Sequence, residues 1–274
     1  SDTDNDRQQA YQILVTENVT GRKIYNSKKK TSGESQFVAI PKLKANRHGY
    51  QWKVRVWDKD GNPSEWSRSQ TIRVAPALTG KGAPSWIGAI TRRDARLPEG
   101  RFSNAEFKKE SFKSLWSPVD TLSAKSIILR KEFPCGGKRI TDATLYVSGM
   151  GHYEMRINGR KVGDSEFAPL WSEYSKTVYY NTYDVTEMLG RGTNALSVML
   201  GNGFFNVQRG GRYSKLMTSF GAPQMTMRME INYSDGTSKT IVSDGSWKYA
   251  LSPVTFNSIY GGESYDARLV QGKA

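Results

Sequence analysis

The chain has 274 residues, which is enough for one large domain or two ordinary ones with a core that needs no covalent cross-links. Its single cysteine, Cys135, excludes an intrachain disulfide framework and any cysteine metal cluster. Forty Lys and Arg against 26 Asp and Glu give a net charge of +14, which suggests an anionic partner but fits a solvated basic surface equally well.

The composition favours strands and turns, because 14 Tyr, 10 Phe and 7 Trp supply bulky packing and 26 Gly supply turns. In the first 76 residues, apolar runs predict short strands at Tyr11–Val15, Lys23–Tyr25, Gln36–Ile40, Tyr50–Trp57 and Thr71–Val74. The fourth is the clearest, since its side chains alternate with the period of a half-buried strand. Several short strands separated by turn signals predict a β-sandwich.

The block YQWKVRVWDKDGNPSEWS, at Tyr50–Ser67, resembles a fibronectin type III-like module. Such a module normally has about seven strands, whereas about five can be identified here. We therefore expect residues 1–76 to form a partial fibronectin type III-like sandwich that lacks its first strands.

A segment rich in Pro and Gly, from Ala75 to Pro84, has no periodicity and predicts a domain boundary. An irregular stretch continues to Lys125, and a stretch of this length is usually functional or disordered. Residues 77–125 are therefore predicted to be a linker and irregular segment.

The second half is organised around the stretch Ala143–Trp171. Two alternating runs flank the break at Gly149–Gly151, and alternation of period two is typical of strands with one buried face. The pair Asn158-Gly159 can take the positive φ angles that a two-residue type I′ turn requires. This stretch therefore predicts a meander of strands that ends in a tight hairpin.

More strands follow in chain order. Ala195–Leu200 alternates, and a row of apolar residues from Met225 to Tyr233 precedes a second hairpin signal at Asp235-Gly236. A methionine row of this kind is more often core filler than a partner groove. With eight to ten strands available, residues 126–274 are predicted to form a larger jelly-roll β-sandwich, and the chain as a whole is predicted to be all-β.

Several motifs occur in the order of the N-terminal β-sandwich of bacterial α-L-rhamnosidases, which this chain resembles. They are APSWIGA, LRKEF, ATLYVSGMGHYEMRINGRKVGD, APLWSEYSKTVYYNTYDVT, NALSVMLGNGFFN and IYGGESYDARL. The resemblance implies a multidomain glycoside hydrolase that acts on terminal L-rhamnose of plant polysaccharides or glycosides.

In that family the catalytic acids lie on a helical (α/α)₆ barrel, and no long helical periodicity is present here. The resemblance therefore implies a noncatalytic, ancillary piece whose partners are a rhamnose-containing glycan and the missing catalytic domain. It also implies a secreted or periplasmic location. No run reaches the ~20 apolar residues of a membrane span.

Candidate carbohydrate-binding residues are those that could give an aromatic platform or polar side chains at loop ends. They are Asp164, Glu166, Trp171, Asn202 and Asn206, with Tyr174 as a second platform residue. Each also has a structural reading: Trp171 as core, and the Asn202–Asn206 segment as a glycine-permitted bulge or turn. The acidic pair Glu263 and Asp266 is read as structural and not catalytic.

Calcium is the only cofactor that the resemblance suggests. In some relatives the equivalent domain is a calcium-dependent rhamnose-binding module, with an Asp just after the RxNGxxVG hairpin among its ligands, and Asp164 matches that position. Calcium takes six to eight oxygen ligands, and only Asp164, Glu166 and Asn206 can be named. A plain hairpin loop is the competing interpretation, and no other cofactor is expected.

Two alternatives to a sugar-binding ancillary fragment stay open. One is a structural or adhesion β-sandwich protein without sugar affinity. The other is a nucleic-acid binder, which is disfavoured because the aromatic residues alternate as core and do not form a stacking row beside basic residues. The charge of +14 would suit the galacturonate of an acidic pectin.

Overall fold

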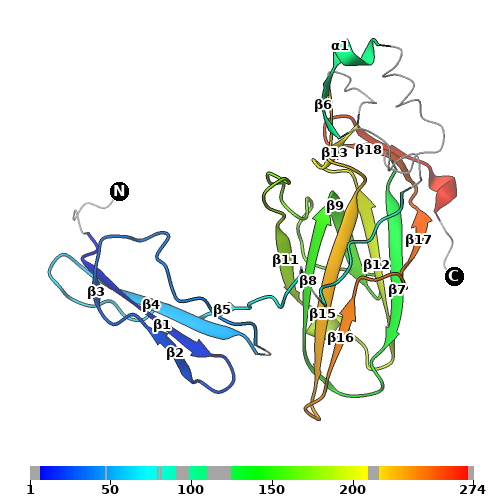
Figure 1. Cartoon of the computed structure of the whole chain (residues 1–274). Coiled ribbons are helices and arrows are strands. Elements are labelled where there is room, and N and C mark those ends of the chain that lie inside the picture. Colours follow the sequence, from blue (N-terminus) through cyan, green and yellow to red (C-terminus); the bar gives the residue numbers. More distant parts are fainter. Residues whose placement is uncertain are drawn as a thin grey trace. The chain divides into compact units, whose positions relative to one another are not determined.

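A computed structural model describes residues 7–46, 48–78, 80, 82–90, 99–109, 125–208 and 216–270. The chain divides into two compact units, Ser1–Pro76 (the first unit) and Ala77–Ala274 (the second unit). Strands dominate both units (Figure 1), and every strand pair in the described residues is antiparallel. The all-β fold class is therefore confirmed.

The first unit is built on one sheet in the order β2-β1-β4-β5, with β3 also paired to β1. Its strands are β1 Ala10–Glu17, β2 Lys23–Asn26, β3 Lys30–Thr31, β4 Tyr50–Trp57 and β5 Gln70–Ile72. Its hydrophobic cluster is built on the buried side chains of Tyr11, Ile13, Val15 and Tyr50. More apolar side chains of the same cluster, such as Trp52 and Val54, are only partly buried, so this core is incompletely covered.

The predicted strand at Gln36–Ile40 is wrong, because this segment is irregular. Phe37 has a φ of +54° and a fully exposed side chain, and a bulky residue at positive φ does not fit a pleated strand. Val38 and Ile40 nevertheless pack against the apolar cluster. The alternation in the sequence therefore reflects burial and not strand pairing, and the loop covers part of the sheet face.

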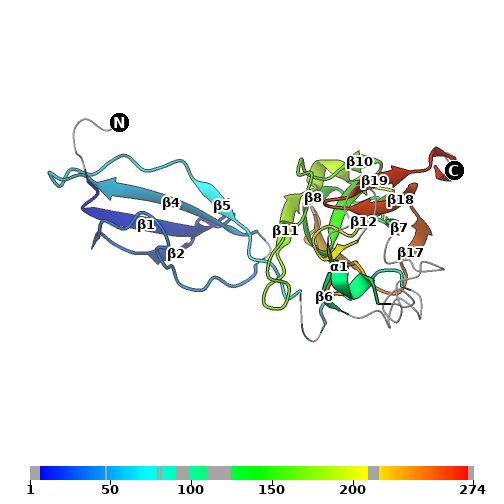
Figure 2. The ribbon, with the colours of Figure 1, turned by 90° about the horizontal axis from the view of Figure 1, so that it is seen from above.

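The second unit is a sandwich of a five-stranded sheet, β10-β9-β12-β7-β17, and a four-stranded sheet, β11-β8-β15-β16. Figure 2, a view along the strands, shows β8 and β11 on one side and β12, β7 and β17 on the other. The strands are β7 Ile127–Pro134, β8 Ile140–Met150, β9 His152–Ile157, β10 Arg160–Lys161, β11 Tyr180–Asp184, β12 Thr193–Gly201, β15 Gln224–Tyr233, β16 Ser238–Val242 and β17 Lys248–Leu251.

Smaller elements gather at one end of this sandwich (Figure 1). They are the sheet of β13 Asn206–Val207, β14 Leu216–Ser219 and β6 Gly100–Ser103, the pair β18 Val254–Ser258 and β19 Gly262–Tyr265, helix α1 Asn104–Phe107 and the 3₁₀ turn η3 Ala267–Leu269. A further 3₁₀ turn, η2, covers Thr186–Met188. No described helix has the length and apolar character needed to cross a membrane.

Residues 77–125 are only partly irregular. β6 pairs with β14 through Met217 and Phe102, and Ile87 bridges to Met225 at the start of β15. The rest of the stretch includes 91–98 and 110–124, which lie outside the described residues.

The sandwich core fills the space between the two sheets. Met225, Met227 and Met229 of β15 are fully buried beside Leu145 of β8, and Val198 of β12 enters the same cluster from the other sheet. The prediction that the methionine row is core filler is confirmed, because unbranched methionine side chains adapt to irregular gaps.

Both predicted hairpins are confirmed. Asn158 and Gly159 have φ angles of 51° and 81°, as a type I′ turn requires, and Arg160 pairs with Ile157 across the turn. The Asn158 side chain also donates to Asn194 Oδ1 at 2.8 Å, which ties the hairpin to β12. Gly236 has a φ of 84° in the turn between β15 and β16.

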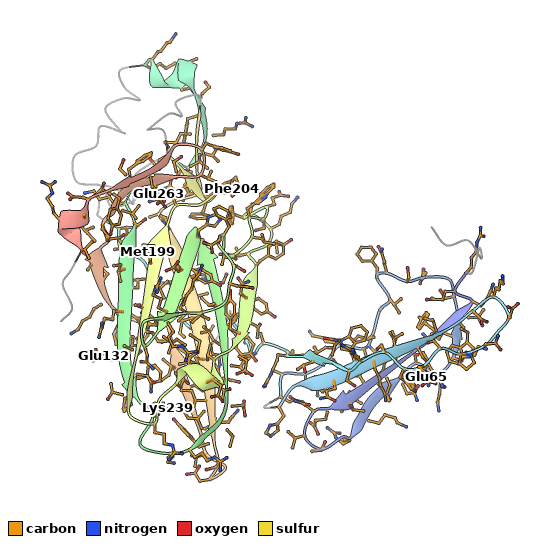
Figure 3. All side chains as sticks on the ribbon, turned by 180° about the vertical axis from the view of Figure 1, so that it is seen from behind. Glu65, Glu132, Met199, Phe204, Lys239 and Glu263 are labelled. Carbon is orange, nitrogen blue, oxygen red and sulfur yellow. The ribbon has the colours of Figure 1, made fainter. Side chains whose placement is uncertain are left out.

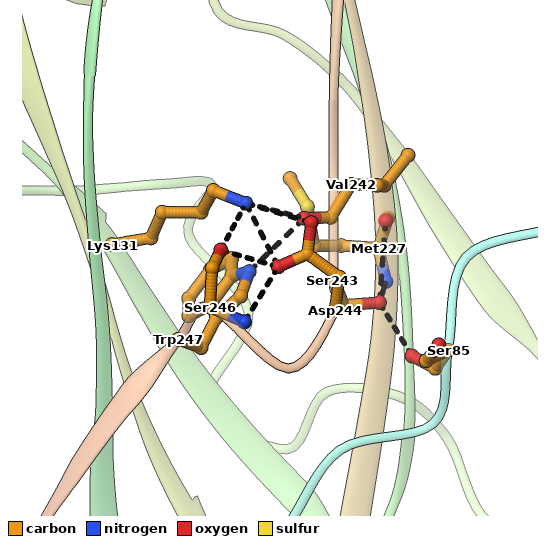
Figure 4. Close-up of polar contacts among 8 residues, drawn as sticks. All are labelled: Ser85, Lys131, Met227, Val242, Ser243, Asp244, Ser246 and Trp247. Carbon is orange, nitrogen blue, oxygen red and sulfur yellow. Dashed lines mark hydrogen bonds and ion pairs between the residues drawn. The ribbon is translucent and has the colours of Figure 1, made fainter.

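A polar clamp joins β7 to the turn after β16 (Figure 4). The Lys131 ammonium lies 3.0 Å from Asp244 Oδ2 and donates to Ser246 Oγ at 2.9 Å. Hydrogen bonds, first from Ser246 and then from Lys131, hold the pKa of Asp244 below its usual value. The hydroxyl of the neighbouring Ser243 donates to the carbonyl of Ser85 at 2.6 Å. This bond attaches the segment around Ser85, which precedes the strands of the second unit, to the sandwich.

Candidate functional site

A cavity of about 400 Å³ opens at the end of the second unit where the small sheets gather (the loop-end cavity). Strand ends and turns from four elements line it: His152 and Glu154 of β9, Gly203 after β12, Asn257 of β18 and Glu263 of β19. Figure 3 shows Phe204 and Glu263 at this end and Lys239 at the opposite end. The position of the loop-end cavity at the end of a rigid sandwich is typical of binding sites.

A row of aromatic rings extends outward from the cavity. This aromatic rim consists of His152 and Phe167, which line the cavity, and of Phe204, Trp171 and Tyr260 beside them. The Phe204 ring centroid lies 5.7 Å from that of Trp171, 6.0 Å from that of Tyr260 and 6.1 Å from that of His152. Phe167 continues the row, 5.5 Å from His152. Trp171, Tyr260 and Phe167 are 63%, 55% and 61% exposed, so these rings form an open surface and not a closed core.

The local sequence explains how Phe204 reaches this position. Gly203 has a φ of +52°, and a Cβ there would lie 2.9 Å from two ring atoms of His152. Glycine therefore permits a tight turn directly against His152. The next two residues face opposite ways, since Phe205 is buried and packs on Tyr174, while Phe204 joins the rim.

A network of buried amide side chains lies beneath the cavity as its floor, and of these amides only Asn257 is itself part of the lining. Asn257 Oδ1 accepts from the backbone N–H of Asn202 at 2.7 Å, and Asn202 Nδ2 donates to the Asn257 carbonyl at 3.0 Å. Asn206 Nδ2 donates to Asn202 Oδ1 at 2.9 Å, and Gln208 Nε2 donates to Asn206 Oδ1 at 2.7 Å. Asn257 Nδ2 also reaches Ser126 Oγ at 3.0 Å. This network holds the end of β12, the strand β13 and the strand β18 in fixed positions relative to one another.

Charged side chains stand on one wall. The Lys161 ammonium lies 2.9 Å from Glu166 Oε1 and 3.9 Å from Glu154 Oε2, and Arg156 lies 2.8 Å from Glu154 Oε1. Lys161 therefore neutralises and orients two of the glutamates that line the cavity. Glu263 is the third acidic residue of the lining.

Burial lowers the pKa of His152, because the charged imidazolium is poorly solvated under Phe204 and Phe167. The ring is therefore neutral at neutral pH and can donate or accept a hydrogen bond. Burial also raises the pKa of the neighbouring Tyr153 hydroxyl, which donates to Asn181 Oδ1 at 2.9 Å.

The predicted site residues lie in different parts of the second unit. Trp171 and Glu166 lie at the cavity, one on the aromatic rim and one in the lining. Asn202 and Asn206 are 0% and 1% exposed, so they hold the floor and do not face solvent. Asp164 is exposed in the turn after β10. Tyr174 packs on Phe205 and Phe220 and is not the platform partner of Trp171.

Sequence reasoning missed most of the rim, namely Phe204, Phe167, Tyr260 and His152. A signal was present in the NGFFN motif, because two adjacent aromatic residues after a strand must point to opposite sides. The contributions of Phe167 and Tyr260 depend on long-range folding of two loops and carry no local signal.

The described residues include no group of three or more His, Cys, Asp or Glu side chains placed to hold a metal ion. Glu166 is engaged by Lys161, and Asn206 is enclosed in the amide network. The oxygen ligands named for calcium therefore do not converge around Asp164 in this arrangement.

Asp266, considered as one half of an acidic pair with Glu263, has a structural role. Its carboxylate accepts from the Arg268 backbone N–H at 3.0 Å and pairs with the Arg268 guanidinium at 2.7 Å, at the start of η3. These bonds to Arg268 hold the pKa of Asp266 below its usual value. A carboxylate stabilised as an anion in this way is not suited to donate a proton.

Two family models match the chain. The model of the α-L-rhamnosidase N-terminal domain matches residues 138–273, and that of a Rha78A-like N-terminal immunoglobulin domain matches residues 1–77. An immunoglobulin domain is a β-sandwich like the fibronectin type III module, so the second match fits the sheet of the first unit.

Curated relatives and solved structures give the same result. An α-L-rhamnosidase of Formosa agariphila is 36% identical over 97% of this chain, and one of Streptomyces avermitilis is 36% identical over 84%. The α-L-rhamnosidase structures from Dictyoglumus thermophilum and Aspergillus terreus are each 29% identical over 96% of the chain, with TM-scores of 0.68 and 0.66. The chain spans only 28% of the Formosa protein and 28% of each of these two structures.

Proposed function

The chain belongs to the α-L-rhamnosidases and matches the N-terminal portion of their sequences, and on this premise we propose that it is a noncatalytic, carbohydrate-binding part of such an enzyme. The whole protein would hydrolyse terminal L-rhamnose from a glycan outside the cytoplasm, in the periplasm or after secretion. This portion would hold the glycan and support the catalytic domain.

The aromatic rim above a polar floor is the observation that supports carbohydrate binding. A sugar ring has an apolar face of C–H groups and an equator of hydroxyls, so it fits flat aromatic side chains with polar groups beside them. Trp171, Phe204 and Tyr260 supply the rings, while Glu263 and Glu166 supply acceptors at the wall. The methyl group of a 6-deoxyhexose such as rhamnose would add apolar contact with the rim.

The electrostatics of the described residues favour a noncatalytic role. Glycoside hydrolysis needs a carboxylic acid that stays protonated near neutral pH, which requires a raised pKa. Every described carboxyl group with a displaced pKa is displaced downward by hydrogen bonds or by basic neighbours, including Asp244 and Asp266. In the cavity, Lys161 already pairs with two of the three glutamates.

Replacement of one rim residue tests this proposal. We expect Tyr260→Ala to weaken binding of an α-L-rhamnoside by about fivefold, since one aromatic contact contributes roughly 1 kcal/mol. Tyr249→Ala is the matched control, because Tyr249 is similarly exposed (58%) but lies on β17 and belongs neither to the cavity lining nor to the row of rings that includes Tyr260. Affinity is measured by isothermal titration with and without calcium. Equal losses in both variants would contradict the assignment of the cavity.

The exposed rim also fits a second function, in which Phe167, Leu170 and Trp171 contact another protein domain. Exposed apolar patches of this kind commonly mark protein interfaces. A structural or adhesion protein of this type would show no heat with any rhamnoside. Its Trp171→Ala variant would still lose binding to the domain that it contacts.

A further inference from the structure

Cationic and tryptophan side chains alternate in a row on the first unit. The Lys29 ammonium lies 4.8 Å from the Trp57 ring centroid, and the Arg55 guanidinium lies 4.9 Å from both the Trp57 and the Trp66 centroids. The Lys53 ammonium lies 5.0 Å from the Trp66 centroid. We call this row, Lys29–Trp57–Arg55–Trp66–Lys53, the cation–tryptophan strip.

The backbone holds the strip in place. Lys53, Arg55 and Trp57 are alternate residues of β4, so they project from one face of the sheet at intervals of ~6.7 Å. The segment with Trp66 is pinned beside β4, because Ser64 N donates to the Val56 carbonyl and Ser67 N to the Val54 carbonyl, each at 2.8 Å. The Ser64 and Ser67 hydroxyls accept in return from the Val56 and Val54 N–H groups, each at 3.1 Å.

The three cations have no acidic partner in the part of the chain that the structure describes. Arg55 uses one donor, Nε, on Gln12 Oε1 at 2.9 Å, and neither Lys29 nor Lys53 forms an ion pair there. The nearby Asp58 is engaged elsewhere, since its carboxylate accepts from the N–H groups of Asp60 and Asn62. A fixed row of cations without counter-charges is a site for an anion.

We propose that the cation–tryptophan strip binds the carboxylates of an acidic polysaccharide. A linear row of cations on a flat sheet face suits an extended polymer with repeated single charges, and the Arg55 guanidinium can pair with a carboxylate through two parallel bonds. Stacking on tryptophan orders the long side chains in advance, which reduces the entropy lost on binding. This proposal does not depend on the loop-end cavity.

The strip is less suited to single-stranded nucleic acid. Base stacking needs uncovered ring faces, but Trp57 is 7% exposed and each tryptophan ring of the strip already carries two cations.

The test uses the whole chain and the double variant Lys29→Gln/Lys53→Gln, which removes the two end charges and keeps Arg55 and both tryptophans. The matched control is Lys42→Gln/Lys44→Gln, with the same charge change. Both control residues are exposed on the loop whose Val38, Ile40 and Leu43 cover the other, apolar face of the sheet. Binding to polygalacturonate is measured at low and at physiological salt, and the thermal transition of each variant confirms folding.

We expect the strip variant to bind polygalacturonate about fivefold more weakly at low salt, the size expected for two exposed ion pairs, and the control by less than twofold. The difference should shrink as salt rises, because exposed charges are screened. Equal losses in the two variants would assign binding to net charge and overturn the proposal. So would equally tight, equally strip-dependent binding of single-stranded DNA or anionic vesicles, or no binding of the unaltered chain. Rhamnoside affinity should be unchanged in the strip variant, which separates this result from failure of the loop-end cavity.

Discussion

The two units of this chain differ in how completely their hydrophobic cores are covered. In the second unit, two sheets enclose a core in which Leu145, Met227 and Ile231 are completely buried. In the first unit, the described residues form one sheet, and a cavity of about 500 Å³ remains beside Ile13 and Val54. A second sheet excludes water from a β core far better than a loop does.

The difference also divides the candidate functions. The well-packed second unit holds its loops rigidly enough to shape a cavity with a fixed amide floor. Among the described residues of the first unit, the cavity of about 500 Å³ is lined mainly by apolar side chains, and the most distinctive surface is a flat strip of charges. The two proposals therefore assign recognition by shape to the second unit and recognition by charge to the first.

The largest expected difference between the two units is in the stability lost when one buried isoleucine of each is replaced by alanine. Ile231→Ala in β15 is expected to destabilise the second unit by about 3–5 kcal/mol, because the void would be enclosed on all sides. Ile13→Ala in β1 should cost the first unit no more than about 2 kcal/mol, since its side chain already borders a cavity. Urea unfolding followed by tryptophan fluorescence and by circular dichroism measures both losses.

This comparison would be broken by equal losses, or by one transition in which both units unfold together. Equal losses would mean that the first unit is packed as tightly as the second, and a joint transition would mean that the two units do not unfold independently.

A smaller effect is expected at the clamp of the second unit. Lys131→Met should lower the free energy of unfolding by about 1–2 kcal/mol, because the Lys131 side chain is only 17% exposed and its ammonium would no longer bond to Asp244 and Ser246. The adjacent Arg130→Gln is the control, since both partners of its pair with Glu132 are 57% exposed and such pairs contribute about 0–1 kcal/mol. Chemical denaturation gives both values, and a larger loss in the control would rule out the clamp.

The smallest expected effect concerns pH. Burial lowers the pKa of His152, so the unfolded chain takes up a proton near pH 6.5 that the folded chain binds only at lower pH. Stability from this group is therefore complete well above about pH 6.5 and falls as the pH drops through that value, by no more than about 1.4 kcal/mol at about pH 5.5. His152→Gln should flatten this part of the stability profile. An unchanged slope in the variant would assign it to other groups.

Local patterns were sufficient to predict much of the fold. Alternation in Met225–Tyr233 and the Asn158-Gly159 turn depend only on neighbours in sequence, and both were predicted correctly. The strand predicted at Gln36–Ile40 was wrong, because a loop that packs alternate apolar side chains on a sheet shows the same alternation as a strand. Periodicity reports which side chains are covered, and it does not report what covers them.

The candidate site was less predictable. Trp171 and Glu166 were found because they follow a recognisable hairpin, whereas Tyr260 and Phe167 reach the rim only through the folding of distant loops. Asn202 and Asn206 were identified as polar groups at a strand exit, but a polar side chain at a strand end can equally serve the fold. Because both side chains are fully buried, we assign them a structural role.

The most direct test titrates a rhamnose-capped oligosaccharide into the whole chain while free rhamnose is assayed in the same sample. A saturable heat of binding that is reduced by Tyr260→Ala, with no rhamnose released, is the predicted result. Released rhamnose, or binding that is absent or indifferent to the rim, would contradict the account of this chain as a noncatalytic sugar-binding part of an α-L-rhamnosidase.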